Sequence, residues 1–436
     1  MGLMGVTRAR LAELAPKRSF RIAVAVAFVL GHLVAFTVAG HTRLHLPFNS
    51  APGQEIYYSD PDAHALMPAP RQPHYWSRLI VSRWDSQHYI GFAVRGLTAC
   101  PKGGTGQQFL SCGLAWMPTL GLLAGAVTDA TGAPPDYVLL VFSMIAAIVI
   151  NLLWTSRTMV KQLGLFEAYA ALVAFNVFGS AFYVVTPYNE ACVFACMLGG
   201  YICLANGRWL RAGALIGAAT ALRPTAVGFA AGFGCAALVA AWQARKAAAP
   251  RWWRPLVAIP LAGWGQLVMM ALFAIMLGDA KAYVHAQFAF GGANAGLHGH
   301  RFLEAPFYLL SFTSQHMDGV LLFGSLALIA LTARELAAKL PRPELTFLAI
   351  ASAAMAILPM AALWGYWGLN RYLLMCPLIF VAAGVLARKH RALFVLWLVA
   401  CVAIYWHVEL CSYISHGDPR VCPCLGRMQF TMSFES

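Results

Sequence analysis

Asp85, His88 and Tyr89 lie within one short segment, residues 83–89, whose sequence is RWDSQHY. Apolar and aromatic residues in and around this segment recur near helical spacing, which predicts a helix. In a helix the three side chains stand at positions i, i+3 and i+4 and therefore share one face. A carboxylate placed in this way can act as a general base towards a hydroxyl, with His88 tuning it or binding a phosphate. The alternative is that Asp85 pairs with Arg83 or caps an interfacial helix.

Two further polar residues, Asn189 and Glu190, follow Pro187 at the outer end of an expected membrane span. Charged groups at membrane depth are rare and usually face a cavity or a partner, which favours a role in substrate binding. A structural alternative stays open, because Asn189 can cap a helix and the helix dipole favours Glu190 in the first turn.

Arg223 stands inside a run of Ala, Leu and Thr residues. An unpaired charge within a membrane costs at least about 2.5 kcal/mol, so this guanidinium needs a partner or solvent. It either binds a phosphate or pairs with Glu190 or Asp85.

Arg371 is a second candidate for binding an anionic ligand. The tripeptide Asn370-Arg371-Tyr372 opens another expected span at the outer face. Tyr372 fits the aromatic belt at a membrane interface. A binding role and a purely structural role both remain open for these residues.

A Gly-rich stretch around Arg301 contains His298, His300 and Glu304 and has the composition of a mobile loop over a site. A His-x-His pair does not make a zinc site, which needs three or four ligands. The sequence also has no P-loop and no GxGxxG in a βαβ context. We therefore expect no metal and no cofactor.

The chain has 11 cysteines, and two pairs of them are placed where disulfides form. Cys100 and Cys112 lie on the expected outer side, where a bridge would pin the first loop. Cys422 and Cys424 in the C-terminal tail are the second candidate pair. The sequence alone leaves both bridges open.

The amino-acid composition indicates which class of protein carries these candidate residues. The chain has 436 residues, of which 60% are hydrophobic and 11% charged, with a mean hydropathy of +0.65. Soluble domains are about half apolar and about a quarter charged. Apolar runs of about 20 residues, the length that crosses a bilayer, recur along most of the chain. These values exclude a soluble globular enzyme, a disordered chain and a secreted disulfide scaffold.

The net charge of +14 reports topology rather than nucleic-acid binding. The basic residues form short clusters between apolar runs, as the positive-inside rule expects of cytoplasmic loops. The first span follows five basic residues and lacks a good cleavage site, which predicts a retained helix with the N-terminus inside. We therefore expect a lipid bilayer and no nucleic acid as partners.

We predict an all-α polytopic membrane protein of about 11 membrane helices. The stretch 212–242 is expected to be a hairpin of short helices with Arg223 and Pro224 at its outer tip, because both of its ends must be cytoplasmic. Residues 110–127 are expected to form an interfacial or re-entrant helix that contains Pro118. The remaining expected spans are 20–40, 137–154, 166–185, 191–205, 256–277, 318–331, 345–364, 372–386 and 393–410.

This topology divides the chain into three parts. Residues 1–19 form a cytoplasmic N-terminus, residues 20–410 a membrane domain, and residues 411–436 an extracytoplasmic tail that carries cysteines. Within the membrane domain, residues 41–112 form a large extracytoplasmic loop with interfacial helices. Nearly every unusual polar residue falls on the outer side, so we expect a site built from several outer loops.

The segment RWDSQHY resembles the RWD-x-x-(H/Y)-(Y/F) segment after the first span in the GPI mannosyltransferase II family and its bacterial relatives. Three other segments are similar to that family in order and approximate spacing. They are the turn at 186–190 (TPYNE), the hairpin at 221–225 (ALRPT) and the helix start at 371–377 (RYLLMCP). The chain departs from the family at 115–119, where AWMPT stands in place of Phe-Pro-Leu-Tyr-Pro.

The resemblance implies a C-type glycosyltransferase, an inverting enzyme that takes a sugar, in this family mannose, from a polyprenyl-phosphate donor at the outer face. It implies that Asp85 is the catalytic base, and the acceptor hydroxyl does need a base within hydrogen-bond reach. The departing phosphate needs positive charge, which arginine or histidine side chains can supply without a metal. The acceptor would be a glycan, a glycolipid or a protein. The expected donor-phosphate and substrate-binding residues are Arg83, His88, Tyr89, Asn189, Glu190, Arg223, Arg301, Asn370, Arg371 and Tyr372.

The alternative function is a multispan transporter or a lipid flippase. Transport folds commonly show paired repeats with broken helices in matching positions, whereas this chain shows one broken pair. A non-catalytic membrane subunit is a third interpretation, which the presence of Asp85 disfavours. The absence of any Asn-x-Ser/Thr acceptor fits a bacterial inner membrane, with the active site on the extracytoplasmic face.

Overall fold

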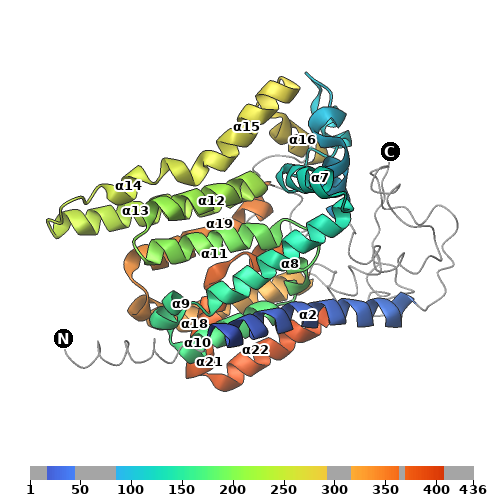
Figure 1. Cartoon of the computed structure of the whole chain (residues 1–436). Helices are drawn as coiled ribbons and strands as arrows, with labels where there is room; N and C mark the ends of the chain where they lie inside the picture. Colours follow the sequence, from blue (N-terminus) through green and yellow to red (C-terminus); the bar gives the residue numbers. More distant parts are fainter. Residues whose placement is uncertain (1–16, 45–84, 292–315, 363–368, 407–436) are drawn as a thin grey trace.

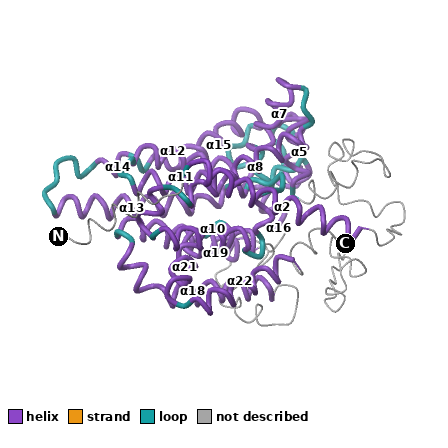
Figure 2. The backbone as a smooth tube through the Cα atoms, turned by 60° about the horizontal axis from the view of Figure 1, so that its bottom comes forward, coloured by secondary structure: helices purple, strands orange, loops and turns teal. Residues whose placement is uncertain are grey.

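The computed structural model describes residues 17–44, 85–291, 316–362 and 369–406, and all regular elements within them are helices. Figure 1 shows these helices packed side by side in one bundle. Most of them run lengthwise between two ends, where the loops lie (Figure 2). The helices are α2 (Arg18–Leu44), α5 (Ser86–Arg95), α6 (Gly106–Ser111), α7 (Thr119–Thr131), α8 (Pro135–Trp154), α9 (Arg157–Leu163), α10 (Leu165–Val177), α11 (Glu190–Ala205), α12 (Trp209–Leu222), α13 (Val227–Lys246), α14 (Arg254–Val257), α15 (Trp264–Leu277), α16 (Ala282–Gly291), α18 (His316–Lys339), α19 (Arg342–Ala362), α20 (Leu369–Leu374), α21 (Pro377–Lys389) and α22 (Arg391–Ile404).

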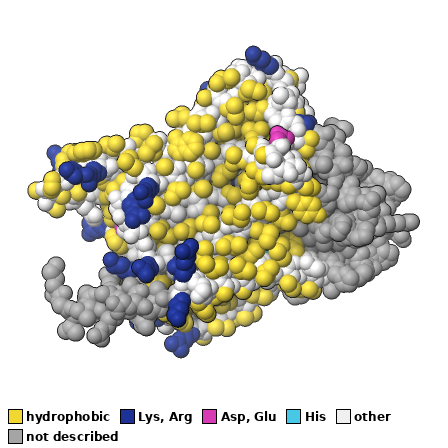
Figure 3. Space-filling view, in the orientation of Figure 1, with side chains coloured by type: hydrophobic (Ala, Val, Ile, Leu, Met, Phe, Trp, Pro, Cys, Tyr) yellow, Lys and Arg dark blue, Asp and Glu magenta, His cyan; other side chains and the backbone are white. Residues whose placement is uncertain are grey.

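Five segments of the described chain are long and apolar enough to cross a membrane. Other expected spans form shorter apolar helices, among them α10, α11, α12 and α22. The surface between the two ends of the bundle is largely hydrophobic (Figure 3), and Ile275 on α15 is 73% exposed. Such a surface is compatible with a lipid environment. The five segments are Arg18–Val38, Pro135–Trp154, Pro224–Lys246, Arg254–Leu277 and Gly319–Lys339.

The expected break at Arg223 and Pro224 is present. Arg223 has an extended backbone (φ −151°, ψ 127°) between α12 and the short helical turn Pro224–Ala226 that leads into α13. The ring of a proline disfavours the helical conformation for the residue before it, which explains why α12 ends at Leu222. The break leaves the Arg223 side chain at a helix end, where it can meet residues of other helices.

Proline also divides two segments that the sequence pattern predicts as single helices. The expected helix 110–127 is wrong in this respect, because α6 ends at Ser111 and Pro118 stands at the N-terminal boundary of α7. The expected span 372–386 is divided into α20 and α21, with Pro377 as the first residue of α21. Proline lacks a backbone N–H and fits the first turn of a helix far better than its interior.

The core is rich in aromatic side chains from four helices. Phe175 stacks on Phe194 with ring centroids 5.0 Å apart and meets Phe380 edge-on at 5.2 Å. Trp154, which is fully buried, closes the cluster. Glycine allows close contact between helices elsewhere: a Cβ at Gly121 of α7 would lie 2.4 Å from the carbonyl oxygen of Tyr89 on α5. Small residues at such contacts let two helix backbones approach each other.

Most of the visible lysine and arginine side chains gather at one end of the bundle (Figure 3). At that end, Glu167 of α10 accepts hydrogen bonds from Lys339 at 2.8 Å and Arg388 at 2.9 Å. Arg21 of α2 donates to the carbonyl oxygen of Leu152 at 2.6 Å. These contacts join α10 to α18 and α21, and α2 to α8, at the basic end. Helices α5, α7 and α16 lie at the opposite end (Figure 1).

Candidate functional site

Asp85 and Arg371 form an ion pair between two distant parts of the chain. Nη1 of Arg371 donates to Oδ2 of Asp85 at 2.5 Å. Asp85 is the residue before α5, and Arg371 lies in α20, whose first turn is held by a 2.8 Å hydrogen bond from Ser180 Oγ to the carbonyl oxygen of Asn370. Both charged side chains remain partly exposed, Asp85 by 22% and Arg371 by 19%.

A second ion pair joins Glu190, the first residue of α11, to Arg223 at the end of α12. Arg223 Nη1 donates to Glu190 Oε1 and lies 3.3 Å from Asn189 Oδ1. Asn189 in turn donates through Nδ2 to the carbonyl oxygen of Leu222 at 2.7 Å. Asn189 stands at the N-cap position of α11 and Glu190 lies in its first turn, as the structural alternative expected. The Asn189 side chain makes no capping hydrogen bond, however, and contacts Arg223 instead.

The two ion pairs meet in a single cluster, because Arg371 Nη1 also lies 3.7 Å from Glu190 Oε1. Asp85, Arg371, Glu190 and Arg223 thus alternate in charge along a row, which we name the charge chain. Its formal charges, two carboxylates and two guanidiniums, sum to zero. This alternation of opposite charges offsets much of the cost of burying each charge.

Tyrosine rings surround the arginines of the charge chain. The Arg223 guanidinium carbon lies 4.3 Å from the centroid of the Tyr372 ring. The corresponding atom of Arg371 lies 5.5 Å from Tyr183 and 5.7 Å from Tyr188. These contacts are within the range of cation–π attraction and restrict the guanidinium planes.

The electrostatics of the cluster fix the protonation states at neutral pH. Burial raises the pKa of the Asp85 carboxyl, but the charge and hydrogen bond of Arg371 outweigh it, so the pKa lies below its ordinary value. Burial opposes the charged form of Arg371, but Asp85 and Glu190 hold its pKa well above the ordinary value. Burial and the charge of Glu190 raise the pKa of Tyr89 well above its ordinary value. Asp85 is thus an ionised acceptor and Tyr89 a neutral phenol.

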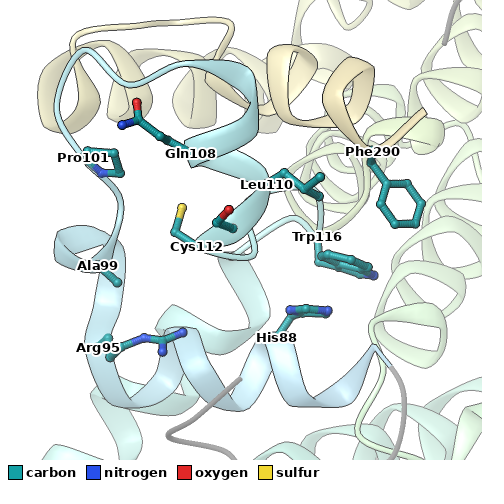
Figure 4. A pocket seen from close by; sticks show the side chains of 10 residues that line it. His88, Arg95, Ala99, Pro101, Gln108, Leu110, Cys112, Trp116 and Phe290 are labelled. Atoms are coloured by element: carbon teal, nitrogen blue, oxygen red, sulfur yellow. The ribbon is translucent and has the colours of Figure 1, made fainter. Parts of the chain in front are cut away.

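His88 lines a pocket of about 740 Å³ beside the charge chain. The His88 ring stacks on the Trp116 ring, with centroids 3.5 Å apart. The ring of Phe290 on α16 meets the Trp116 ring edge-on, with centroids 5.4 Å apart (Figure 4). The backbone N–H of His88 donates to the carbonyl oxygen of Asp85 at 3.1 Å, so the pocket begins one helical turn from that carboxylate. The lining residues are His88, Arg95, Ala99, Pro101, Gln108, Leu110, Ser111, Cys112, Trp116 and Phe290.

A disulfide between Cys100 and Cys112 closes one side of the pocket, with the two Cα atoms 5.3 Å apart. Gly113 follows with a positive φ of 87°, and a Cβ there would lie 3.2 Å from Nδ1 of His88. The Gln287 side chain of α16 donates to the carbonyl oxygen of Ala115 and anchors that helix over the same loop. The second candidate bridge, Cys422 with Cys424, lies outside the described residues.

The structure brings six of the expected site residues together: Asp85, Asn189, Glu190, Arg223, Arg371 and Tyr372. Tyr89 is buried near them, and His88 lines the neighbouring pocket. Asn370 contributes its backbone carbonyl to the support of α20. Arg83 and Arg301 lie outside the described residues.

Sequence reasoning missed Tyr183 and Tyr188 around Arg371, and Trp116, Phe290 and Arg95 at the pocket. Tyr188 lies in the TPYNE turn and could have been chosen from it. Trp116 lies in the AWMPT segment and could likewise have been chosen from it. Tyr183 and Phe290 carry no local signal, because aromatic residues are frequent throughout this chain, and nothing in the sequence around Arg95 distinguishes it. Within the residues that the structure describes, no three His, Cys, Asp or Glu side chains converge to hold a metal ion.

No protein-family model, curated protein or solved structure matches this chain.

Proposed function

We propose that the protein is a membrane glycosyltransferase that moves a sugar from a polyprenyl-phosphate donor to an acceptor hydroxyl, with inversion at the anomeric carbon. The observation that carries the proposal is the Asp85–Arg371 contact. It places a carboxylate and a guanidinium side by side, partly exposed and one helical turn from a pocket. Mannose as the sugar follows from the family resemblance of the sequence.

The reaction needs two groups, and the charge chain contains both. The Asp85 carboxylate accepts the proton of the acceptor hydroxyl while that oxygen forms its bond to the anomeric carbon. The bond between the anomeric carbon and the phosphate oxygen breaks, and its electron pair stays on the phosphate. Arg371 stabilises the charge that develops there, as a guanidinium does for phosphoryl oxygens. The neutral phenol of Tyr89 can donate a hydrogen bond beside them.

The topology of the proposed enzyme follows from the two ends of the bundle. We place the end that carries most lysine and arginine side chains in the cytoplasm by the positive-inside rule. The charge chain and the pocket are then extracytoplasmic, in a bacterial inner membrane. The shorter helices pack with the five long segments, so that the whole chain crosses about eleven times. The acceptor is a glycan, a glycolipid or a protein on that outer side.

A direct assay tests the proposal against the transporter alternative. Purified protein is incubated with polyprenyl-phosphate mannose that carries tritium in the sugar, with and without a delipidated extract of bacterial envelope glycans. Label that moves to the extract with release of polyprenyl phosphate supports the transferase. The same donor is then placed in liposomes that contain the protein. Movement of intact donor between the two leaflets, without any transfer, would contradict the proposal and favour a transporter or flippase.

A further inference from the structure

The two arginines of the charge chain differ in how firmly they are held. Arg223 donates to Glu190, lies 3.3 Å from Asn189 and faces the ring of Tyr372 at 4.3 Å. Its side chain is 10% exposed, and that of Glu190 is 1% exposed. Arg223 is therefore committed to buried partners and has little surface left for a ligand.

Arg371 is held by a partner that can move. The Asp85 side chain is 22% exposed and lies at the residue before α5, where it makes no capping hydrogen bond to the helix. Turning this carboxylate away from Arg371 breaks one ion pair and disturbs no helix cap. Arg371 itself is 19% exposed, so a ligand can reach the guanidinium from the same side.

Charge balance decides which carboxylate a phosphate would displace. The charge chain already sums to zero, so a phosphate that arrives beside Arg371 adds uncompensated negative charge next to Asp85. Like charges in contact repel strongly at the edge of a low-dielectric interior. Glu190 cannot leave without stranding Arg223 as a buried, unpaired charge, which is costly. Asp85 can leave, because its side chain is 22% exposed, against 1% for that of Glu190.

We propose that Arg371 is the phosphate ligand of this site and that Asp85 occupies the place of the phosphate while no donor is bound. The inference rests on the proposed function and deepens it. A donor phosphate that binds Arg371 displaces the Asp85 carboxylate towards the neighbouring space lined by His88. The displaced carboxylate loses its guanidinium partner and becomes a stronger base for the acceptor hydroxyl. Donor binding therefore switches on the base, and Asp85 alone does not deprotonate an acceptor in the empty site.

The test uses the sign of an affinity change. Detergent-solubilised protein is titrated with tritiated farnesyl phosphate, with farnesol as the control for partition and inorganic phosphate as the control for a lipid-free anion. Asp85→Asn is compared with Asp279→Asn, a matched change in an aspartate that pairs with His285 outside the charge chain. Asp85→Ala is measured beside it, so that a folding defect of one substitution does not decide the result.

If Asp85 competes for Arg371, its removal tightens farnesyl phosphate binding by about fivefold, the worth of a roughly 1 kcal/mol ion pair. Asp279→Asn should bind like the wild type, and Arg371→Gln should lose binding. Equal or weaker binding by both Asp85 variants overturns the exchange while leaving wild-type donor binding, and so the proposed function, in place. No farnesyl phosphate binding by the wild type or by either Asp85 variant overturns both. Equal gains for farnesyl and inorganic phosphate would support the exchange at Arg371 and contradict a lipid-linked donor.

Discussion

Arg371 Nη1 lies 2.5 Å from Asp85 Oδ2, although 286 positions separate the two residues in the chain. The contact brings Asp85, the residue before α5, against α20, and Glu190 of α11 lies 3.7 Å from the same Arg371 nitrogen. Three parts of the chain that are far apart in the sequence therefore supply one cluster. The cluster contains an ionised carboxylate with a lowered pKa next to a guanidinium that a phosphate can bind.

Replacement of Arg371 should lower catalysis strongly, because this guanidinium is the proposed ligand of the donor phosphate. Arg371→Gln removes the charge that stabilises the departing phosphate, which typically costs a factor of about 100 or more in kcat/KM. Arg371→Lys keeps the charge but loses the planar geometry, so an intermediate loss is expected. Steady-state transfer measures both, with the exposed Arg391→Gln as the control. Unchanged kcat/KM in Arg371→Gln would contradict the role given to this guanidinium.

Replacement of Glu190 should destabilise the protein, because Glu190 is the counter-ion of the buried Arg223. Glu190→Gln leaves Arg223 buried without its counter-ion, and breaking a buried pair in this way costs about 3–5 kcal/mol. Adding Arg223→Gln removes the stranded charge and should restore much of that loss. Thermal unfolding of the two single variants and the double variant gives the coupling. Strictly additive losses would show that the two side chains do not form the pair described above.

Acid should release Asp85 from Arg371. The folded pKa of Asp85 lies below its ordinary value of 3.8, so the pair stabilises the folded state above that value. The stabilisation is lost as the pH falls below 3.8 and through the lowered folded pKa, because the protonated carboxyl no longer attracts the guanidinium. The difference in melting temperature between the wild type and Asp85→Asn should shrink over that range. A difference that grows with acid would contradict the direction of the shift.

Gly121 should tolerate no side chain, because α7 lies directly against α5 at that position. A Cβ at Gly121 would lie 2.4 Å from the carbonyl oxygen of Tyr89, whereas nothing lies within 4 Å of one at Gly324. We expect Gly121→Ala to destabilise the protein by about 1–3 kcal/mol, the usual cost of overpacking. Gly324→Ala is the control and should be close to neutral. Equal melting temperatures for the two variants would show that α5 and α7 are not in this contact.

The helical class and the break at Arg223 could be predicted because they depend on local sequence patterns. The break at Arg223 follows from Pro224 alone, and the concentration of charge at one end follows from the basic clusters. The two divided helices were missed because an apolar run hides the effect of Pro118 and Pro377 on helix boundaries. Asp85 was expected to share a helix face with His88, whereas it precedes α5 and pairs with Arg371.

The pairing of charges could not be read from the sequence. Arg223 had Glu190, Asp85 and a phosphate as equally acceptable partners, and only the packing of α11 on α12 selects Glu190. Arg371 had no carboxylate partner assigned to it, because α20 lies far from residue 85 in the chain. Tyr183 reaches Arg371 by the same kind of long-range packing. Long-range contacts between short helices leave no periodic signal in the chain.

Sugar transfer by Asp85→Asn tests the proposed role of Asp85 as the catalytic base most directly. Tritiated mannose from polyprenyl-phosphate mannose is followed into the envelope extract by the wild type, Asp85→Asn and Asp279→Asn, each shown to be folded by its melting curve. We predict that Asp85→Asn loses transfer by a factor of at least about 100, the contribution of a general base, while Asp279→Asn retains it. Transfer by Asp85→Asn at the wild-type rate would contradict the assignment of Asp85 as the base and with it the mechanism proposed for the charge chain.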